Sequence, residues 1–484
     1  MKRIKNILCG LLLTVTLLSS CTSFDELNTD PIRLQDANPG TFLNPILYEM
    51  SSYNWNRYNS YTFAVMQSKV ATNSTSGVGW YNIGDGEGDG TWTNYYKWLN
   101  NIREMEKQAI ALNEPNYQAI SITLRSWIYQ LLTDAFGDVP MTEASRGNEQ
   151  LFTPKFDSQQ QIYQKLIDDL EIANSLFDEA SGLRYNKDGE LLYETTAAVT
   201  AGKSEGIVRW RKFANSLRLR ILLRVANVPV FNAKAELAKM INNPTVYPVF
   251  QSNDDAAMVY ITGVFPQDPP MIRPQDLTAY IVVSDFFVDN LQKWNDPRLP
   301  IFITQATNNG KKSYIGWPSG YDLVPSFNAS APNQGIAKAP MQLALMTYAE
   351  LEFIKAELAL KGIAGSDAKG SYEKGVKAAI EQWGGVMPAS YFEDSDAAYD
   401  GTLDRIMLQK FYALIFCDYQ QWFEHNRTGL PELPRGAGIP DGNQMPKRFK
   451  YPATLQRTNL KNYQIAKENM GGDDVNISLI WQKK

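Results

Sequence analysis

Apolar residues recur every three or four positions over several long stretches of this 484-residue sequence. That spacing places them on one face of an α-helix. In the fourth stretch, for example, Ile162, Leu166 and Leu170 share one face, while Asp168 and Asp169 lie on the other. The pattern predicts a mainly α-helical protein whose helices follow one another in pairs. The predicted helical stretches lie at about 43–70, 91–112, 116–136, 158–178, 209–227, 341–362, 366–383 and 402–425.

Long segments without helical spacing separate these helices, namely 181–205, 245–345 and 427–484. The middle segment is rich in proline, which interrupts helices and central strands. Loops of this length in a compact protein are usually functional or pack as an irregular subdomain. We therefore expect one domain over 41–484, with minor β-structure and a long irregular insertion at 245–340. Its helix pairs are predicted near 43–112, 116–178, 209–242 and 341–425.

Residues 1–20 have the build of a signal peptide. A basic start precedes an apolar run from 7 to 18, which is too short to span a bilayer comfortably. The run ends in Leu18-Ser19-Ser20-Cys21, which looks like a lipobox, so we expect Cys21 to carry a lipid anchor. An ordinary secretory leader with an incidental cysteine is the alternative. Residues 21–40 are polar and contain turn-forming residues, and they predict a tether between the anchor and the domain.

The helical pattern within Ser126–Ala144 stops at an elbow. Gly137 permits a positive φ, and Pro140 cannot continue a helix. Asp134 and Asp138 flank this end, where the helix dipole disfavours anions. We therefore expect both carboxylates to accept hydrogen bonds from backbone N–H groups or to pair with arginines. A structural corner is favoured over a catalytic carboxylate pair, because no base or metal partner is visible.

Basic residues accompany the apolar face of the helix predicted at 209–227, namely Arg211, Lys212, Arg218 and Arg224. Such a set can bind an anion. Pairing with the surrounding acidic helices is the favoured interpretation, because charge runs on amphipathic helices usually solvate a face or bridge to neighbours.

Charge and histidine content restrict the function. The formal net charge is −5, and removal of the three basic residues of the leader makes it −8, which argues against nucleic acid as a partner. The single histidine, His425, excludes a multi-histidine metal site and leaves few arrangements for nucleophilic catalysis. Its neighbour Glu424 and the following Gly429 indicate a hydrogen-bonded helix end. We expect no cofactor and no enzymatic activity, and we expect Cys417 to be a buried, unreactive side chain.

Aromatic residues are concentrated between Asn73 and Trp98. Sugar rings stack their C–H faces on aromatic rings while amides bind their hydroxyl groups, so this region suits a carbohydrate. Trp80 and Tyr81 lie in a loop rich in Gly, Ser and Asn, where we expect them to be exposed. The sequence therefore predicts ligand contacts at Trp80, Tyr81, Asn82 and Tyr96.

A second aromatic loop at 314–321 lies in the proline-rich insertion. Trp317 and Tyr321 are predicted to form the other wall of the ligand site, with Asn328 and Asn333 as polar partners. Packing of the insertion onto the helices explains the same aromatic residues equally well.

Asp85, Glu87 and Asp89 alternate with glycines, as acids do in the loop of a calcium site. These three acids are the candidate calcium ligands. The twelfth position of the loop, where a bidentate Glu would lie, is Tyr96. Because that ligand is missing, a glycine-rich loop without metal is the favoured interpretation.

Six motifs stand out in order along the chain: FDELNTDP (24–31), TDAFGDVPMTEA (133–144), WRKFANSLRLR (210–220), MTYAELEFIKAE (346–357), QKFYALIFCDYQQWFEHNRTGLPEL (409–433) and RFKYPATLQRTNLKNY (448–463). Together they resemble the motifs of the SusD/RagB family of outer-membrane nutrient-binding lipoproteins, in the branch of starch-binding proteins associated with the outer membrane. The sequence shows no exact 34-residue repeat, but the resemblance implies four diverged tetratricopeptide-like helix pairs in an α-α superhelix.

The resemblance also implies a function. The protein would be held on the outer face of an outer membrane by lipid on acylated Cys21. It would capture an oligosaccharide without enzymatic activity and cap a SusC-like, TonB-dependent β-barrel transporter. A peptide-binding lid of the same kind of transporter, a surface glycoside hydrolase and an assembly protein without a ligand are the alternatives.

Overall fold

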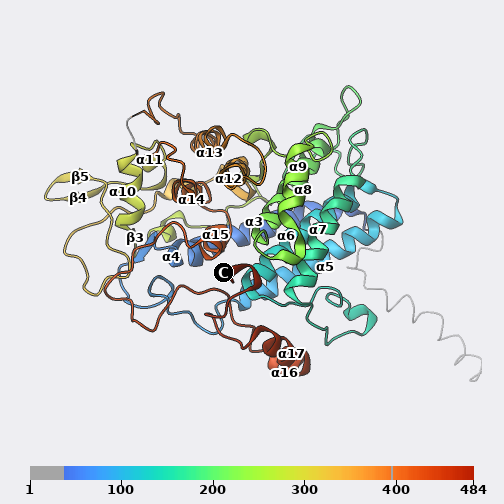
Figure 1. Ribbon diagram of the computed structural model, residues 1–484, viewed down its shortest axis with the longest axis horizontal. Helices are drawn as coiled ribbons and strands as arrows, with labels where there is room; N and C mark the ends of the chain where they lie inside the picture. Colours follow the sequence, from blue (N-terminus) through green and yellow to red (C-terminus); the bar gives the residue numbers. More distant parts are fainter. Residues whose placement is uncertain (1–36, 394–395, 484) are drawn as a thin grey trace, which may run out of the picture. The chain divides into compact units, whose positions relative to one another are not determined.

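Helices form most of the regular structure of this protein (Figure 1). The computed structural model describes residues 37–393 and 396–483, so the predicted signal peptide, Cys21 and most of the tether lie outside the described residues. The prediction of a mainly α-helical fold is confirmed. The helices are α3 (Pro39–Arg57), α4 (Phe63–Val65), α5 (Asp89–Ala111), α6 (Pro115–Phe136), α7 (Gln159–Leu176), α8 (Glu205–Arg224), α9 (Ala233–Asn242), α10 (Asp285–Lys293), α11 (Leu299–Phe302), α12 (Tyr348–Leu360), α13 (Ala368–Gln382), α14 (Leu403–Ala413), α15 (Gln420–Thr428), α16 (Leu455–Thr458) and α17 (Leu460–Met470).

Local signals set where these helices begin. The hydroxyl of Ser158 accepts a hydrogen bond from the backbone N–H of Gln161, and the Gln161 side chain accepts one from the N–H of Ser158. This capping box satisfies donors at the start of α7 that no helical carbonyl can reach. Pro115 starts α6, where its missing N–H costs nothing. The predicted inward face of α7 is buried along its length, at Ile162, Leu166, Ile167 and Leu170.

Consecutive helices pack against each other along the first half of the chain. α5 contacts α6, α6 contacts α7, α7 contacts α8 and α8 contacts α9. Figure 1 shows α5 to α9 gathered on one side, with α12, α13 and α14 as a second group. α8 also packs on α6 and on α12, so it connects the two groups through its buried apolar stripe. The stripe comprises Trp210, Phe213, Ala214, Leu217 and Ile221.

The strands of the described residues form two-stranded antiparallel sheets. One correction concerns 341–347, which was predicted to be helical. Met341–Met346 is strand β6, and α12 begins at Tyr348 after the N-cap Thr347. A short, almost wholly buried apolar run has no alternation that separates strand from helix. The strand pairs are β1 (Lys69–Ala71) with β3 (Ile281–Val283), β2 (Ala257–Ile261) with β6, and β4 (Ala306–Asn308) with β5 (Lys311–Ser313).

The insertion at 245–340 is more regular than predicted. It contains α10, whose N-cap Ser284 accepts a hydrogen bond from the N–H of Phe287. One side of this helix is buried, at Phe287, Val288 and Leu291. Figure 1 shows the insertion, with α10, α11, β4 and β5, on the opposite side from α5 to α9.

The helix predicted at 402–425 is two helices, α14 and α15. Between them Phe416 and Asp418 adopt positive φ angles of 59° and 38°. At this break the Phe416 ring stacks on the Trp55 ring, with ring centroids 4.7 Å apart. Apolar periodicity continues across this break, so the sequence gives no sign of it.

No helix among the described residues is long and apolar enough to cross a membrane.

Candidate functional site

The two predicted aromatic loops meet. Trp80 is the last residue of a short 3-10 helix (Val78–Trp80), and Trp317 and Tyr321 come from the insertion more than 230 residues later. The Tyr321 ring makes edge-to-face contacts with both indoles, with ring centroids 5.2 Å from Trp80 and 5.5 Å from Trp317. The indole N–H of Trp80 donates to the Tyr321 carbonyl at 3.2 Å. The structure therefore brings together three of the residues that the sequence singled out.

The rings of this cluster are buried, which corrects the expected exposure of Trp80 and Tyr81. Trp80 is only 3% exposed and Tyr81 only 9%. The hydroxyl of Tyr321 donates to the carbonyls of Ala71 and Ser74, so the insertion is fastened to the loop after β1. The aromatic rings form the joint between insertion and helices, and their faces are covered by protein.

Polar groups form the exposed rim of this joint, at Ser74, Ser76 and Asn82. The Asn82 side-chain N–H group donates to the Ser76 hydroxyl at 2.9 Å. The backbone carbonyl of Trp80 accepts a hydrogen bond from the side chain of Asn443. We call Ser74, Ser76 and Asn82 the rim. Their side chains carry hydroxyl and amide groups, and the buried rings beside them hold this part of the chain in place.

Tyr96 does not join the cluster. It is half-buried on α5, and its hydroxyl donates to the carbonyl of Pro140 at 2.7 Å. Its ring packs against Trp92, with centroids 5.0 Å apart. Tyr96 therefore connects α5 with the elbow after α6.

The polar partners predicted for the second loop are also engaged elsewhere. The Asn328 side chain donates to the Thr307 carbonyl, and its N–H donates to the Asn308 side chain. The Asn333 side chain donates to the carbonyl of Pro300. These contacts hold loops of the insertion to one another.

The candidate calcium ligands do not converge. Asp85 pairs with Lys450 at 2.8 Å, and Glu87 pairs with Arg57 at 2.8 Å. Asp89 is the first residue of α5, where a carboxylate interacts favourably with the positive end of the helix dipole. Across the part of the chain that the structure describes, no group of three His, Cys, Asp or Glu side chains is placed to hold a metal ion.

The elbow acids are paired as predicted. Asp134 lies 3.1 Å from the guanidinium of Arg224, and Asp138 accepts the backbone N–H of Gln159 at 2.9 Å. Gly137 ends α6 with φ of 93°. The interpretation as a structural corner is confirmed by these contacts.

The basic residues of α8 are also paired with acids. Arg211 binds Glu179 and Lys212 binds Asp255. Arg218 binds Glu171 and Glu236. Together with the Arg224–Asp134 pair, these contacts confirm charge pairing over anion binding.

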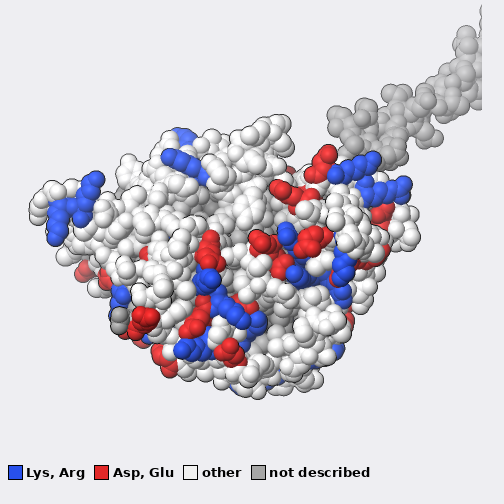
Figure 2. Space-filling model, turned by 90° about the horizontal axis from the view of Figure 1, so that it is seen from above, with Lys and Arg blue, Asp and Glu red and all other residues white. Residues whose placement is uncertain are grey.

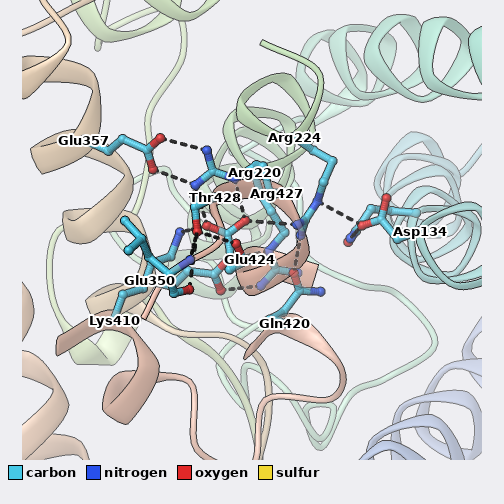
Figure 3. A network of polar contacts seen from close by, with 12 residues as sticks. Asp134, Arg220, Arg224, Glu350, Glu357, Lys410, Gln420, Glu424, Arg427 and Thr428 are labelled. Atoms are coloured by element: carbon cyan, nitrogen blue, oxygen red, sulfur yellow. Dashed lines mark hydrogen bonds and ion pairs between the residues drawn. The ribbon is translucent and has the colours of Figure 1, made fainter. Parts of the chain in front are cut away.

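A charge network that the sequence did not predict surrounds Glu424 (Figure 3). Glu424 binds Arg224 at 3.0 Å, Lys410 at 2.6 Å and Arg427 at 2.7 Å. Arg427 also donates to both carboxylate oxygens of Glu357 at 2.7 Å. Burial opposes ionisation, but the Arg427 guanidinium and the other cations outweigh it, so the pKa of Glu424 lies well below its usual range. All the charges here satisfy one another inside the protein.

His425 lies at the end of α15 and does not share this network. Its Nδ1 is 3.2 Å from the carbonyl of Pro431, and Gly429 caps the helix with φ of 80°. Burial lowers the pKa of His425. The pair Glu424–His425 thus forms a helix end, as predicted. Cys417 is buried, also as predicted, and burial raises the pKa of its thiol.

Charges of both signs are interleaved on the face seen in Figure 2. Lysines and arginines there are close to aspartates and glutamates along the lower part of the view, and a broad area above carries few charges. A surface of this kind does not attract a polyanion strongly.

Comparisons with known proteins agree with this architecture. A SusD-like family model, described as starch-binding and associating with the outer membrane, matches residues 31–452. A solved chitin-binding protein is 24% identical, with 92% of this chain and 100% of that chain aligned and a TM-score of 0.77. A SusD homologue from Bacteroides fragilis NCTC 9343 is 25% identical, with 93% and 100% aligned and a TM-score of 0.77. An outer membrane protein from Bacteroides vulgatus ATCC 8482, with a suggested role in nutrient binding, is 23% identical, with 92% and 100% aligned and a TM-score of 0.77. No curated protein matches the sequence.

Proposed function

Because this chain belongs to the SusD-like family of starch-binding proteins that associate with the outer membrane, we propose that it captures an oligosaccharide at the cell surface. In this proposal the protein is the lid of a SusC-like, TonB-dependent β-barrel transporter, which moves the ligand inward. The observation that carries the proposal is the family match over residues 31–452, together with a helical fold shared with SusD homologues. The family is one of binding proteins, so capture without turnover is the expected activity.

Lipid on Cys21 is the proposed anchor. Each buried CH₂ group contributes about 0.8 kcal/mol, so two or three acyl chains hold a protein on a membrane. The polar residues 21–40 would give the domain the reach that a lid requires. The anchor would face the exterior, on the side where ligand arrives.

The proposed ligand contacts lie at the rim, next to the joint of Trp80, Trp317 and Tyr321. Hydroxyl and amide groups recognise sugar hydroxyls, and buried aromatic supports keep them in fixed positions. Asn82 is exposed to solvent, as are Ser74 and Ser76. In this proposal the rings position the rim and do not themselves stack on the sugar.

A titration of the purified protein with oligosaccharides tests this site. Asn82→Ala is expected to weaken binding of a malto-oligosaccharide by about tenfold, which corresponds to the loss of one or two hydrogen bonds. Asn148→Ala is the matched control, since Asn148 is also exposed and lies in the short 3-10 helix Gly147–Glu149, outside the rim. Equal affinities of the two variants would remove the rim from the site. Binding of peptides with no binding of any sugar would favour the peptide-binding lid.

A further inference from the structure

A cavity of about 630 Å³ lies beside the β2–β6 sheet and shares no residue with the rim. This volume is in the range of sites that hold small ligands. Its walls include Tyr260 of β2, Gln342 of β6, and Gln382 and Trp383 at the end of α13. None of the described residues that line it carries a charge.

Strand geometry explains why the cavity is open. Tyr260 and Gln342 are direct partners in the β2–β6 register, and Met258 and Ala344 are the next pair on the same face. Met258 and Ala344 are covered by the turn between α14 and α15. That cover ends before Tyr260, which is 59% exposed although its neighbours on β2 are buried. The sheet therefore presents one uncovered aromatic ring to the cavity.

A second aromatic ring is held in place across the end of α13. Trp383 is half-buried and packs edge-to-face on Phe302, with ring centroids 5.1 Å apart and an interplanar angle of 85°. An indole anchored in this way loses little freedom when a ligand binds. Tyr260 and Trp383 thus supply two aromatic surfaces to one cavity.

Amides supply the polar groups. The Gln342 side chain donates to the backbone carbonyl of Gln382 at 2.9 Å, which fixes its direction and leaves its oxygen available to a hydroxyl donor. The side-chain oxygen of Gln382 is buried and has no hydrogen-bond partner among the described residues. A buried oxygen without a hydrogen bond raises the free energy of the folded protein. A small rotation of the Gln382 side chain toward a ligand hydroxyl would supply the missing hydrogen bond.

The electrostatics select a neutral ligand. The lining has no cation to neutralise a carboxylate or sulfate. α13 ends at Gln382, and the C-terminal end of a helix carries a partial negative charge that disfavours anions. Aromatic rings with amides and no charge are the groups that bind sugar rings.

We propose that this cavity is a second binding site for a neutral oligosaccharide, with Tyr260 as the stacking ring and Gln342 as the hydroxyl partner. The inference rests on the proposed function, because it adds a contact point for the same class of ligand. Two separate sites would let one long glycan, or two, engage the protein at once, which raises the apparent affinity for long chains.

The test measures binding of a neutral malto-oligosaccharide and a neutral chito-oligosaccharide to the purified protein by calorimetry. Tyr260→Ala is expected to weaken binding of at least one sugar at this site by about tenfold, so that the titration loses one of its two binding events, and Tyr260→Phe is expected to retain both, because the ring face carries the contact. Gln342→Trp, which fills the cavity from a position that is partly open to solvent, is expected to have the same effect as Tyr260→Ala. Phe152→Ala is the control, since Phe152 is 74% exposed and does not line the cavity.

The outcomes separate this inference from the proposed function. If the unaltered protein binds a sugar and Tyr260→Ala and Gln342→Trp bind it equally well, the cavity is not a site, while glycan capture stands. If Tyr260→Ala and Gln342→Trp lose binding while Asn82→Ala does not, the cavity is the principal site and the rim is not. If the unaltered protein binds neither sugar, both proposals are overturned.

Discussion

Three cations and three carboxylates are buried together where α6, α8, α12, α14 and α15 meet, and every one of them has a partner of opposite sign. A buried pair gives little net stability compared with an apolar pair, but removal of one partner leaves an uncompensated charge. The network therefore fixes how these helices fit together. Its members are Asp134, Arg224, Glu357, Lys410, Glu424 and Arg427.

Glu424→Gln removes the carboxylate that three of these cations share. We expect the free energy of unfolding to fall by about 3–5 kcal/mol, because Arg224 and Lys410 stay buried with one negative charge fewer. Urea unfolding followed by circular dichroism measures the change. Glu381→Gln is the control, since Glu381 is exposed and pairs only loosely with Lys377, and its effect is expected within about 1 kcal/mol. Equal effects of the two substitutions would contradict the assigned role of the network.

Glu190 gives the protein a pH dependence. Burial raises the pKa of Glu190 to about 7, although the backbone N–H groups of Leu192 and Tyr193 partly oppose the shift. The folded protein then holds a proton that the unfolded chain releases near pH 4.3. The contribution of Glu190 to the free energy of unfolding is therefore fully present below the unfolded-state pKa, and it is lost as pH rises through about 7.

Glu190→Gln tests this dependence. An amide keeps the acceptor oxygen but does not ionise, so the variant is expected to lose less stability than the unaltered protein between pH 5 and about pH 8. Unfolding free energies measured across that range give the comparison. Glu468→Gln, at an exposed position on α17, is expected to follow the unaltered protein. A parallel pH profile for Glu190→Gln would show that Glu190 does not titrate there.

Among the elements, the elbow after α6 depends on one glycine. Gly137 has φ of 93°, and a Cβ at this position would lie 2.5 Å from Cε of Met470 and 3.1 Å from Cδ2 of Leu479. Gly137→Ala is expected to lower the free energy of unfolding by about 1–3 kcal/mol through backbone strain, with some further loss from displacement of α17. The comparison is Gly147→Ala, where the nearest atom is 3.8 Å away. If Gly137→Ala left the free energy of unfolding unchanged, the elbow would tolerate another backbone conformation.

Helices with a clear apolar face were predicted within a few residues, as for α5, α6, α7 and α13. The failures share one physical cause. Phe416 and Asp418 interrupt α14–α15 because tertiary contacts, such as the stack of Phe416 on Trp55, outweigh local propensity. The strand Met341–Met346 was missed because pairing with β2 is a contact across some 80 residues, which a local pattern does not contain.

For the whole molecule, the sequence predicted that the two aromatic loops come together. It did not predict that their rings are buried. Aromatic composition in a Gly-rich loop indicated a contact surface, yet Trp80, Trp317 and Tyr321 cover one another once the insertion folds back. Of the residues that line the cavity at Tyr260, the sequence singled out Asn333 alone, because the lining comes from separate elements with no shared motif. Fold class follows from periodicity, whereas a binding surface depends on which rings remain uncovered.

The measurement that tests the central claim most directly is a calorimetric titration of the purified protein with a malto-oligosaccharide, alone and in the presence of the SusC-like transporter that the proposed function requires. We predict saturable binding by the protein alone, and tighter binding in the assembly, because a lid and a barrel that enclose one ligand both contact it. Capture without turnover also predicts that the sugar is recovered intact. No heat of binding in either state, or steady cleavage of the sugar, would contradict the account.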